Sequence, residues 1–430
     1  MSASHKLKSL VFAALLGSVS LSAQAVKFDY SGFVTIGMGQ LDKDRVKFAD
    51  YDNQLSFNTD TRMGFQIDAE ITDDFSVIAQ PIVKAYSVSD PNDDYQAEID
   101  WAYLSYRLTP SVKLRVGRLR VPQYMVSDYL QVGYGYHWVR PPVDVYLLRA
   151  EPFNHYQGGE IFYSGKYRGY EINFQAMYGS FSEKTADIEV SVDQMTGLNF
   201  SATGENFTFR YAYLLHNVDL DVPDLVPLVD GFMQVGDGIA PFDAAVAEEF
   251  YAIARMYEIS DEPYTYQAGG IKYELENWLI YTEFSLVDSS NPFGSDSKNT
   301  YFSVAYQFEN LTPYFFVSSY SNTLSDQIEN AINATYESIG REVNDGLNQL
   351  RDGGLQSVQR SNLKQKSLAI GLRYDFYENM DLKFEAMKVF PEEIVGGQLS
   401  NDGLAGSDNF PNGERFPNIV VYSFTFDYIF

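Results

Sequence analysis

Apolar and polar residues alternate with a period of two in many separate stretches of this chain. Near the C-terminal end the residues of one parity are Val420, Tyr422, Phe424, Phe426, Tyr428 and Phe430. The same alternation runs through residues 62–71, 170–179, 207–216 and 367–376. Because successive side chains of a β-strand point to opposite faces, this pattern predicts strands with one apolar face and one mixed or polar face.

Short polar turns and long loops alternate between the predicted strands. The seven short turns lie at residues 72–74, 109–111, 165–168, 203–206, 276–277, 309–312 and 378–379. The eight long segments, rich in Asp, Gly, Asn and Pro, lie near residues 40–60, 88–96, 120–154, 182–187, 218–262, 288–298, 324–362 and 391–415. Fifteen connections predict sixteen strands, or eighteen if 218–262 or 324–362 contains another hairpin. Short turns on one rim and long loops on the other are typical of a transmembrane antiparallel β-barrel with periplasmic turns and extracellular loops.

The composition favours a barrel that faces lipid. Aromatic residues make up 16% of the chain and gather near strand ends, for example at Trp278 and Tyr281, where a membrane barrel places its aromatic girdles. A soluble β-sandwich is the alternative, but it rarely uses so much Tyr and Phe. Closure of the sheet is expected because an open edge in hydrocarbon leaves backbone groups unpaired, at several kcal/mol each.

Charge and cysteine content exclude several classes of function. The net charge of −27 opposes binding to nucleic acid, whose phosphates repel such a chain. The chain has no cysteine, which excludes disulfides, zinc–thiolate sites, iron–sulfur clusters and thiol nucleophiles. No cofactor and no metal site are expected, because His137 and His155 have no partners at metal-ligand spacing.

The first 25 residues have the pattern of a secretory signal peptide. Lys6 and Lys8 precede an apolar run at residues 10–19, and Ala23-Gln24-Ala25 supplies small residues at the two positions that a signal peptidase reads. The run is too short to span a bilayer, although an N-terminal membrane anchor is the alternative. We therefore expect this segment to be removed on export, and residues 26–430 to form the barrel.

Two of the long loops contain helix-like spacing. Apolar residues recur at three-, four- or seven-residue intervals from Ser325 to Leu350, with Ser325 as the predicted N-cap and Gly353-Gly354 as the predicted stop. A second helix is expected between Phe242 and Ile259. Such helices either cover the barrel mouth or dock a partner.

Four short segments resemble the general diffusion porins of Gram-negative outer membranes. Residues 28–35 (FDYSGFVT) resemble the first porin strand, 61–65 (TRMGF) the second, and 162–164 (FYS) the Tyr-rich strand after the third loop. The closing residues 424–430 (FTFDYIF) end in Phe430 and resemble the aromatic-terminated signal that the outer-membrane assembly machinery reads.

This resemblance implies a homotrimer of sixteen-stranded barrels in the cell outer membrane, in contact with lipid and lipopolysaccharide. It implies that the third loop, here residues 120–154, folds into each lumen. It further implies a water-filled channel for passive diffusion of small hydrophilic solutes and ions, and no enzyme activity. The loop departs from the enterobacterial pattern, because it lacks Pro-Glu-Phe-Gly-Gly and Glu151-Pro152-Phe153 is only a partial match.

Side-chain parity predicts which charged groups face the lumen. The basic residues opposite the apolar face are Arg62, Arg107, Lys113, Arg115, Arg210 and Arg373. Arginine facing lipid at mid-bilayer costs about 2–4 kcal/mol, which agrees with this placement. The third loop region adds the bases Arg118, Arg120, Arg140 and Arg149 and the acids Asp128, Asp144 and Glu151. A basic wall opposite an acidic loop predicts a transverse field that favours polar solutes and sets ion preference. The alternative is that these groups form salt bridges that hold the loop.

Two other functions remain open from the sequence. The third loop is rich in aromatic residues, among them Tyr124, Tyr136, Trp138 and Tyr146. This composition favours either a saccharide-selective channel or simple packing of the loop against the wall. A barrel enzyme is the more remote alternative, because it needs a nucleophile, a His base and an orienting carboxylate in one constellation.

Overall fold

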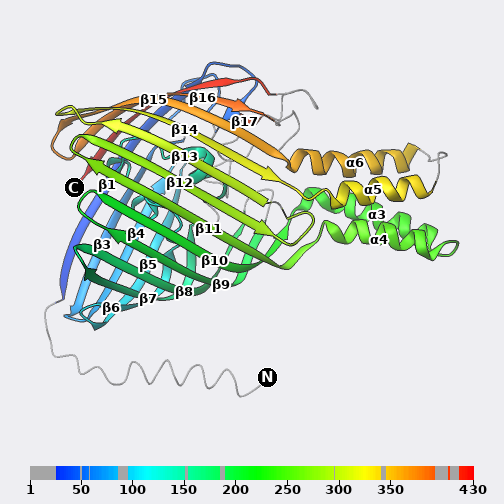
Figure 1. Ribbon diagram of the computed structural model, residues 1–430, viewed down its shortest axis with the longest axis horizontal. Helices are drawn as coiled ribbons and strands as arrows, with labels where there is room; N and C mark the ends of the chain where they lie inside the picture. The colour runs from blue at the N-terminus through cyan, green and yellow to red at the C-terminus, as the bar shows by residue number, and fades with distance from the viewer. Residues whose placement is uncertain are drawn as a thin grey trace.

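Sixteen antiparallel strands close into a single barrel, in which the first strand pairs with the last (Figure 1). The computed structural model describes residues 26–48, 51–57, 59–85, 95–150, 154–184, 189–294, 296–339, 345–392, 405–406 and 416–430. The predicted signal peptide, residues 1–25, lies outside the described residues. The barrel confirms the all-β class and the predicted number of strands, and it excludes the eighteen-strand alternative.

The barrel strands follow the predicted segments along the chain. They are β1 (Lys27–Leu41), β3 (Arg62–Thr72), β4 (Phe75–Lys84), β5 (Gln96–Thr109), β6 (Val112–Arg120), β7 (His155–Tyr167), β8 (Tyr170–Lys184), β9 (Glu189–Thr203), β10 (Phe207–Asp221), β11 (Ile259–Leu275), β12 (Trp278–Ser289), β13 (Asp296–Tyr306), β14 (Leu311–Thr323), β15 (Leu363–Tyr377), β16 (Met380–Pro391) and β18 (Ile419–Ile429). Two short strands, β2 (Lys47–Phe48) and β17 (Ala405–Gly406), pair with each other outside the barrel sheet.

The seven predicted short turns all join consecutive barrel strands. Several of them contain a residue with a left-handed backbone, at Arg168 (φ 50°), Glu276 (φ 53°), Glu309 (φ 47°) and Asn379 (φ 61°). Tight hairpins need positive φ because their twist then matches the right-handed twist of the flanking strands. The C-terminus lies at the same rim as these turns (Figure 1).

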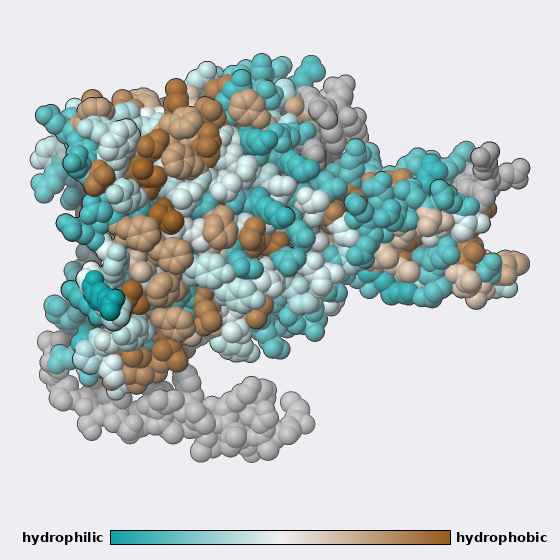
Figure 2. Space-filling view, in the orientation of Figure 1, coloured by the Kyte–Doolittle hydropathy of each residue, from teal (hydrophilic) through white to brown (hydrophobic). Residues whose placement is uncertain are grey.

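The outer face of the barrel is apolar and aromatic. Figure 2 shows hydrophobic residues gathered over the barrel wall. Exposed aromatic side chains near the turn rim include Phe28, Tyr30, Tyr106, Tyr163, Tyr167, Tyr170, Trp278, Phe308, Tyr374 and Phe376. So much exposed apolar surface is expected where hydrocarbon replaces water, with aromatic residues at the interface.

The third loop lies inside the barrel rather than outside it. It connects β6 to β7 and contains the 3₁₀ turns η1 (Ser127–Tyr129) and η2 (Gly133–Gly135) and the helix α2 (Val143–Ala150). Figure 1 shows its turns and helix enclosed by the strands. We call residues 121–154 the inward loop. Its position confirms the prediction that the third loop folds into the lumen.

Two other loops together build a helical bundle that projects from the long-loop rim (Figure 1). The β10–β11 loop contributes η3 (Pro223–Leu225), α3 (Val226–Ile239) and α4 (Ala244–Met256). The β14–β15 loop contributes α5 (Gln327–Ser338) and α6 (Asp345–Ser361). The bundle has its own core, which consists of Phe232, Phe250, Ile253, Ala254, Tyr257, Leu324, Ile328, Ile332, Tyr336 and Val358. No helix in the described part of the chain has the length and hydropathy needed to cross a bilayer.

The helix boundaries differ from those predicted from spacing. The single helix expected after Ser325 is two helices, and α6 runs through Gly353-Gly354 instead of ending there. A Cβ on Gly354 would lie 2.7 Å from the Ile332 side chain and 3.1 Å from that of Phe232. Close packing between helices therefore outweighs the propensity cost of about 1 kcal/mol for a helical glycine.

The other predicted helix is shorter than expected and has an additional neighbour. Helix α4 begins after Asp243, whose side chain accepts hydrogen bonds from the N–H groups of Ala245 (3.0 Å) and Val246 (3.2 Å). Helix α3 was not predicted, because Pro227 and the glycines at 231, 236 and 238 have low helix propensity and interrupt the apolar spacing of this segment. Gly236 lies directly against the ring of Tyr251 on α4.

We predict that Phe232→Ala loosens the bundle without opening the barrel. Phe232 has 0% exposure in the bundle core, and such truncations cost about 3–5 kcal/mol. Limited proteolysis in detergent should cut α3 to α6 while the barrel band stays protected. The matched control is Phe242→Ala, because Phe242 is 90% exposed at the end of the α3–α4 hairpin and its loss should change nothing. Equal cleavage of both variants would contradict an autonomous bundle core.

Candidate functional site

Basic residues of the barrel wall hold the inward loop by its backbone. Arg62 on β3 donates from Nε to the Gln131 carbonyl (2.7 Å) and from Nη2 to the Tyr136 hydroxyl (2.5 Å). Arg373 on β15 donates from Nη1 to the carbonyls of Tyr134 (2.8 Å) and Tyr136 (2.9 Å). Sequence parity predicted both arginines to face inward, and their hydrogen bonds show that they anchor the loop.

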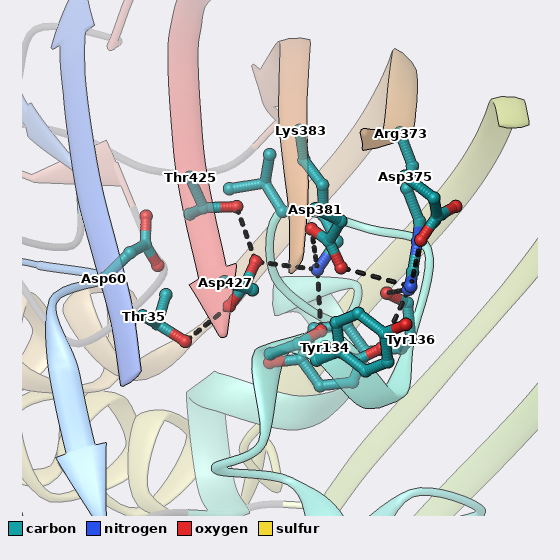
Figure 3. Close-up of polar contacts among 12 residues, drawn as sticks. Thr35, Asp60, Tyr134, Tyr136, Arg373, Asp375, Asp381, Lys383, Thr425 and Asp427 are labelled. Carbon is teal, nitrogen blue, oxygen red and sulfur yellow. Dashed lines mark hydrogen bonds and ion pairs between the residues drawn. The ribbon is translucent and has the colours of Figure 1, made fainter. Parts of the chain in front are cut away.

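A second anchor surrounds Lys383 on β16 (Figure 3). Its Nζ donates to the Gly133 carbonyl (2.6 Å) and pairs with Asp427 (2.9 Å) and Asp381 (3.5 Å). Thr35 on β1 donates to the other oxygen of Asp427 (2.5 Å). Because an unpaired buried charge is costly, this network fixes η2 against β1, β16 and β18.

A third anchor links the inward loop to the first long loop. Arg140 donates from Nε (3.1 Å) and Nη2 (2.5 Å) to the two carboxylate oxygens of Asp60. The Tyr51 hydroxyl donates to Asp60 as well (2.7 Å), and the Arg140 guanidinium lies 5.4 Å from the Tyr51 ring centroid. Burial alone would raise the pKa of Asp60, but Arg140 beside it holds that pKa below its ordinary value. This pair is bidentate, the strongest form of the arginine–carboxylate interaction.

Aromatic residues of the inward loop pack against the wall. Trp138 donates from Nε1 to the Ser303 hydroxyl (2.9 Å) and packs edge-on against Tyr281 and Tyr301. Tyr146 donates to Glu283 on β12, which also accepts from the Met125 N–H (2.8 Å). The rings of Tyr124, Tyr136, Trp138 and Tyr146 are all buried. Their faces are therefore used in packing, which favours that interpretation over a stacking platform for sugar rings.

Asp144 on α2 is anchored without a cation. It has 0% exposure, and it accepts hydrogen bonds from Ser318 (2.5 Å) and Gln365 (2.7 Å). Burial raises the pKa of Asp144 to about 6, and the two hydrogen bonds offset only part of that effect. The sequence suggested an acid facing lumen water across from a basic wall. The structure instead places this carboxyl against β14 and β15, because α2 packs there.

Among the described acids of the inward loop, Asp128 is the one that reaches solvent. Its side chain is 60% exposed, and it pairs with Arg210 on β10 (2.5 Å). Arg210 also donates to the Tyr124 carbonyl (2.5 Å). Burial of part of the group opposes ionisation, but Arg210 lowers the pKa of Asp128 below its ordinary value. Asp128 and Arg210 thus form one opposed pair between loop and wall.

The remaining predicted residues lie on β5 and β6. Arg107, Lys113 and Arg115 share the inward parity, and Arg115 donates to Glu160 on β7 (2.9 Å). Arg120 pairs with Asp100 and donates to the Ser127 carbonyl (3.1 Å). Arg118 occupies the last β5–β6 register pair, opposite Ala102. Glu151 lies outside the described residues, and so does the side chain of Arg149.

Several residues that build the site were missed. They are Asp60, Asp100, Glu283, Asp381, Lys383, Glu385 and Asp427. Asp381, Lys383 and Glu385 alternate with Leu382 and Phe384, so the parity argument used for the arginines also applies to them. Asp60 carries no such signal, because it lies in an irregular loop.

The three histidines in the described residues take part in packing or pairing. His137 contacts the Ser303 hydroxyl (3.2 Å), His155 contacts Asp100 (2.7 Å), and His216 stacks on Tyr264. Burial holds the pKa of His137 well below its ordinary value, with Arg373 and Lys383 adding to the effect. Among the described residues, no group of three or more His, Asp and Glu side chains is arranged to hold a metal ion.

Comparison with solved structures shows the same fold at low sequence identity. The outer membrane channel DcaP of Acinetobacter baumannii matches with a TM-score of 0.53 and 13% identity, over 95% of this chain and 99% of that one. A loop L8 deletion mutant of OmpT, an outer membrane protein of Vibrio cholerae, matches with a TM-score of 0.52 and 11% identity, over 95% of this chain and 100% of that one. OmpF of Salmonella typhi, in complex with daunomycin, matches with a TM-score of 0.50 and 12% identity, over 94% of this chain and 98% of that one. No family model and no curated protein matches the sequence.

We predict that Asp144→Asn removes a pH-dependent loss of stability. A pKa raised from 3.8 to about 6 means that folding favours the protonated carboxyl. The stability that goes with the protonated carboxyl is fully present below pH 3.8 and is lost as the pH rises through 6. The free energy of unfolding falls by about 3 kcal/mol over this range. Unfolding monitored by tryptophan fluorescence in detergent should show the variant more stable than wild type at pH 7 and equal to it at pH 4.

The control for this prediction is Asp60→Asn. Asp60 has a lowered pKa, so it stabilises the fold above its unfolded-state pKa and the contribution is lost as the pH falls. Its amide variant should therefore be less stable than wild type at pH 7. If both variants shifted stability in the same direction at pH 7, the assignment of Asp144 as an uncompensated carboxyl would be wrong.

We predict a large loss of stability for Lys383→Met. The substitution leaves Asp427 buried without its cation and Asp381 paired with Arg373 alone, and breaking a buried pair in this way costs about 3–5 kcal/mol. Lys27→Met is the control, because Lys27 and Glu70 form an exposed ion pair at the turn rim, and exposed pairs contribute little to stability. The measurement is the free energy of unfolding in detergent micelles. A loss below that of the control would show that the Lys383 network does not anchor the loop.

Proposed function

We propose that this protein is a porin-like channel of the Gram-negative outer membrane, through which small hydrophilic solutes and ions diffuse passively. The observation that carries the proposal is a closed barrel with an apolar outer face and a charged interior crossed by one loop. A structural barrel has no need of so many charged groups inside, and a membrane barrel places polar residues there when water fills it.

The likeness to solved outer-membrane barrels supports the same function. DcaP is described as an outer membrane channel, and its fold matches along nearly the whole of both chains. Export with loss of residues 1–25, assembly guided by Phe430 and a homotrimeric state are parts of the proposal that rest on the porin resemblance of the strand motifs. Phe430 closes the β1 edge by exchanging backbone hydrogen bonds with Gly32 (2.9 and 3.0 Å).

A substrate-selective channel is the second candidate. The extent of anchoring favours it, because the inward loop is bonded to β3, β10, β12, β13, β14, β15, β16 and β18. A loop fixed to so many strands narrows the passage and limits its adjustment to different solutes. An enzyme is not proposed, since the histidines are used in the packing described above.

The test is reconstitution of the purified chain into planar bilayers and liposomes. We expect discrete single-channel conductance in KCl, and liposome swelling that falls steeply with solute size. Arg210→Gln should alter ion preference, because it removes the cation that faces the exposed Asp128. Saturable conductance blocked by one solute would favour the selective channel, and the absence of any permeation would exclude both.

A further inference from the structure

Three cations lie side by side on the inward faces of β5 and β6, and only one of them, Arg115, is paired with a carboxylate among the described residues. Arg107 and Lys113 are direct cross-strand partners, and Arg115 follows Lys113 by two residues on the same face. Their lipid-facing neighbours Leu104, Tyr106, Leu108 and Val116 are exposed on the outer surface, which fixes the parity. We call Arg107, Lys113 and Arg115 the cationic strip. It lies between the β5–β6 turn and the inward loop.

The strip differs from the other charged groups of the lumen. Arg140, Arg210, Arg373 and Lys383 each have a carboxylate partner and each bond the inward loop or belong to it. Within the described part of the chain, no ion pair is recorded for Arg107 or Lys113. Like charges directly opposite on neighbouring strands destabilise a sheet. An anion placed between the two side chains would relieve this repulsion.

Arg115 is held so that part of its guanidinium stays available. Its Cζ atom lies 4.6 Å from the Phe162 ring centroid and 5.7 Å from that of Tyr103. One nitrogen, Nη1, donates to Glu160 (2.9 Å). A guanidinium fixed by two rings presents its other N–H groups in a constant direction, and this geometry suits the planar or tetrahedral oxygens of carboxylate and phosphate.

The strip is open to water. The side chain of Arg115 is 23% exposed, Arg107 is exposed, and Lys113 is partly exposed. By contrast, the inward groups Lys383, Glu385 and Asp427 are buried beneath the inward loop. An anion entering from the turn rim would therefore reach the cationic strip before it reached the loop.

We propose that the cationic strip is a binding site for small oxyanions, such as phosphate or a carboxylate-bearing solute, inside the lumen. Arg107 and Lys113 supply the charge, and Arg115 supplies oriented N–H donors. Occupancy relieves the repulsion between the two cross-strand cations. This inference rests on the proposed channel function for access of the anion, and it deepens that function by naming a class of solute.

Binding is tested first without any membrane, on the full-length mature chain in detergent with inorganic phosphate as the probe. Calorimetry or ³¹P line broadening should show saturable binding. Lys113→Gln is expected to weaken it about tenfold, and the double variant Arg107→Gln/Lys113→Gln should abolish it. Lys272→Gln is the matched control: it removes one lumen lysine near the turn rim, but that lysine is paired with Glu274 (2.9 Å). Phosphate affinity should stay within about twofold of wild type there.

Glu160→Gln supplies a test in the opposite direction. It neutralises the carboxylate that bonds Arg115, so phosphate binding should tighten about threefold or more. Because this variant gains affinity, misfolding cannot imitate the expected result. Unchanged affinity in Glu160→Gln together with unchanged affinity in the double variant would overturn the proposal.

A bilayer experiment separates failure of this site from failure of the channel. In a KCl gradient, the reversal potential of Lys113→Gln should move towards cation preference more than that of Lys272→Gln, and phosphate should reduce the wild-type current. A conducting protein with identical phosphate sensitivity in both variants would refute the site and leave the channel intact. Binding that is lost in the double variant, with no conductance in any protein, would refute the channel and leave the site intact.

Discussion

The pairing of β1 with β18 is the interaction on which the rest of this structure depends. Nine residue pairs in register, from Phe33 opposite Ile429 to Leu41 opposite Val421, join the two ends of the sheet. Backbone groups left unpaired in hydrocarbon would each cost several kcal/mol, so an open sheet of these strands has no stable place in a bilayer. Closure also defines an inside and an outside. Once both exist, period-two alternation sends apolar side chains to lipid and polar ones to the lumen.

The closed wall creates a second constraint, because charges that enter the lumen beside the inward loop lose water. The loop and the wall beside it meet this constraint with paired groups: Arg140 with Asp60, Arg210 with Asp128, and Lys383 with Asp427. Each pair joins segments far apart in the chain, so the loop position and the charge pairing are fixed together. Asp144 and Glu283 differ from these pairs, since both are buried and accept hydrogen bonds from neutral donors. The cationic strip is the opposite case: its charge remains accessible to water, and among the described residues only Arg115 is paired, with Glu160.

Parity predicted correctly that Arg62, Arg210 and Arg373 point inward, because a strand leaves only two directions for a side chain. It did not indicate what they touch. Their acceptors in the inward loop are backbone carbonyls, the Tyr136 hydroxyl and Asp128. The positions of these groups follow from how the inward loop folds, and that loop has no period of its own. The helical bundle shows the same limit. The spacing of α5 was visible in the sequence, whereas Gly353-Gly354 suggested a helix end. In the structure Gly354 of α6, like Gly236 of α3, marks a close contact between helices.

The sequence by itself determined the β-barrel class, the order of short turns and long loops, and which face of the alternating strands meets lipid, and it limited the strand number to sixteen or eighteen. These properties are local, because a turn and the alternation of side chains along a strand each depend on residues only a few positions apart. The tertiary structure alone decided which charges are paired, which carboxyl is buried without a cation, and where a cationic surface stays open to water. Those properties depend on strands brought together around the barrel, and the free energy of a charge depends on everything that encloses it.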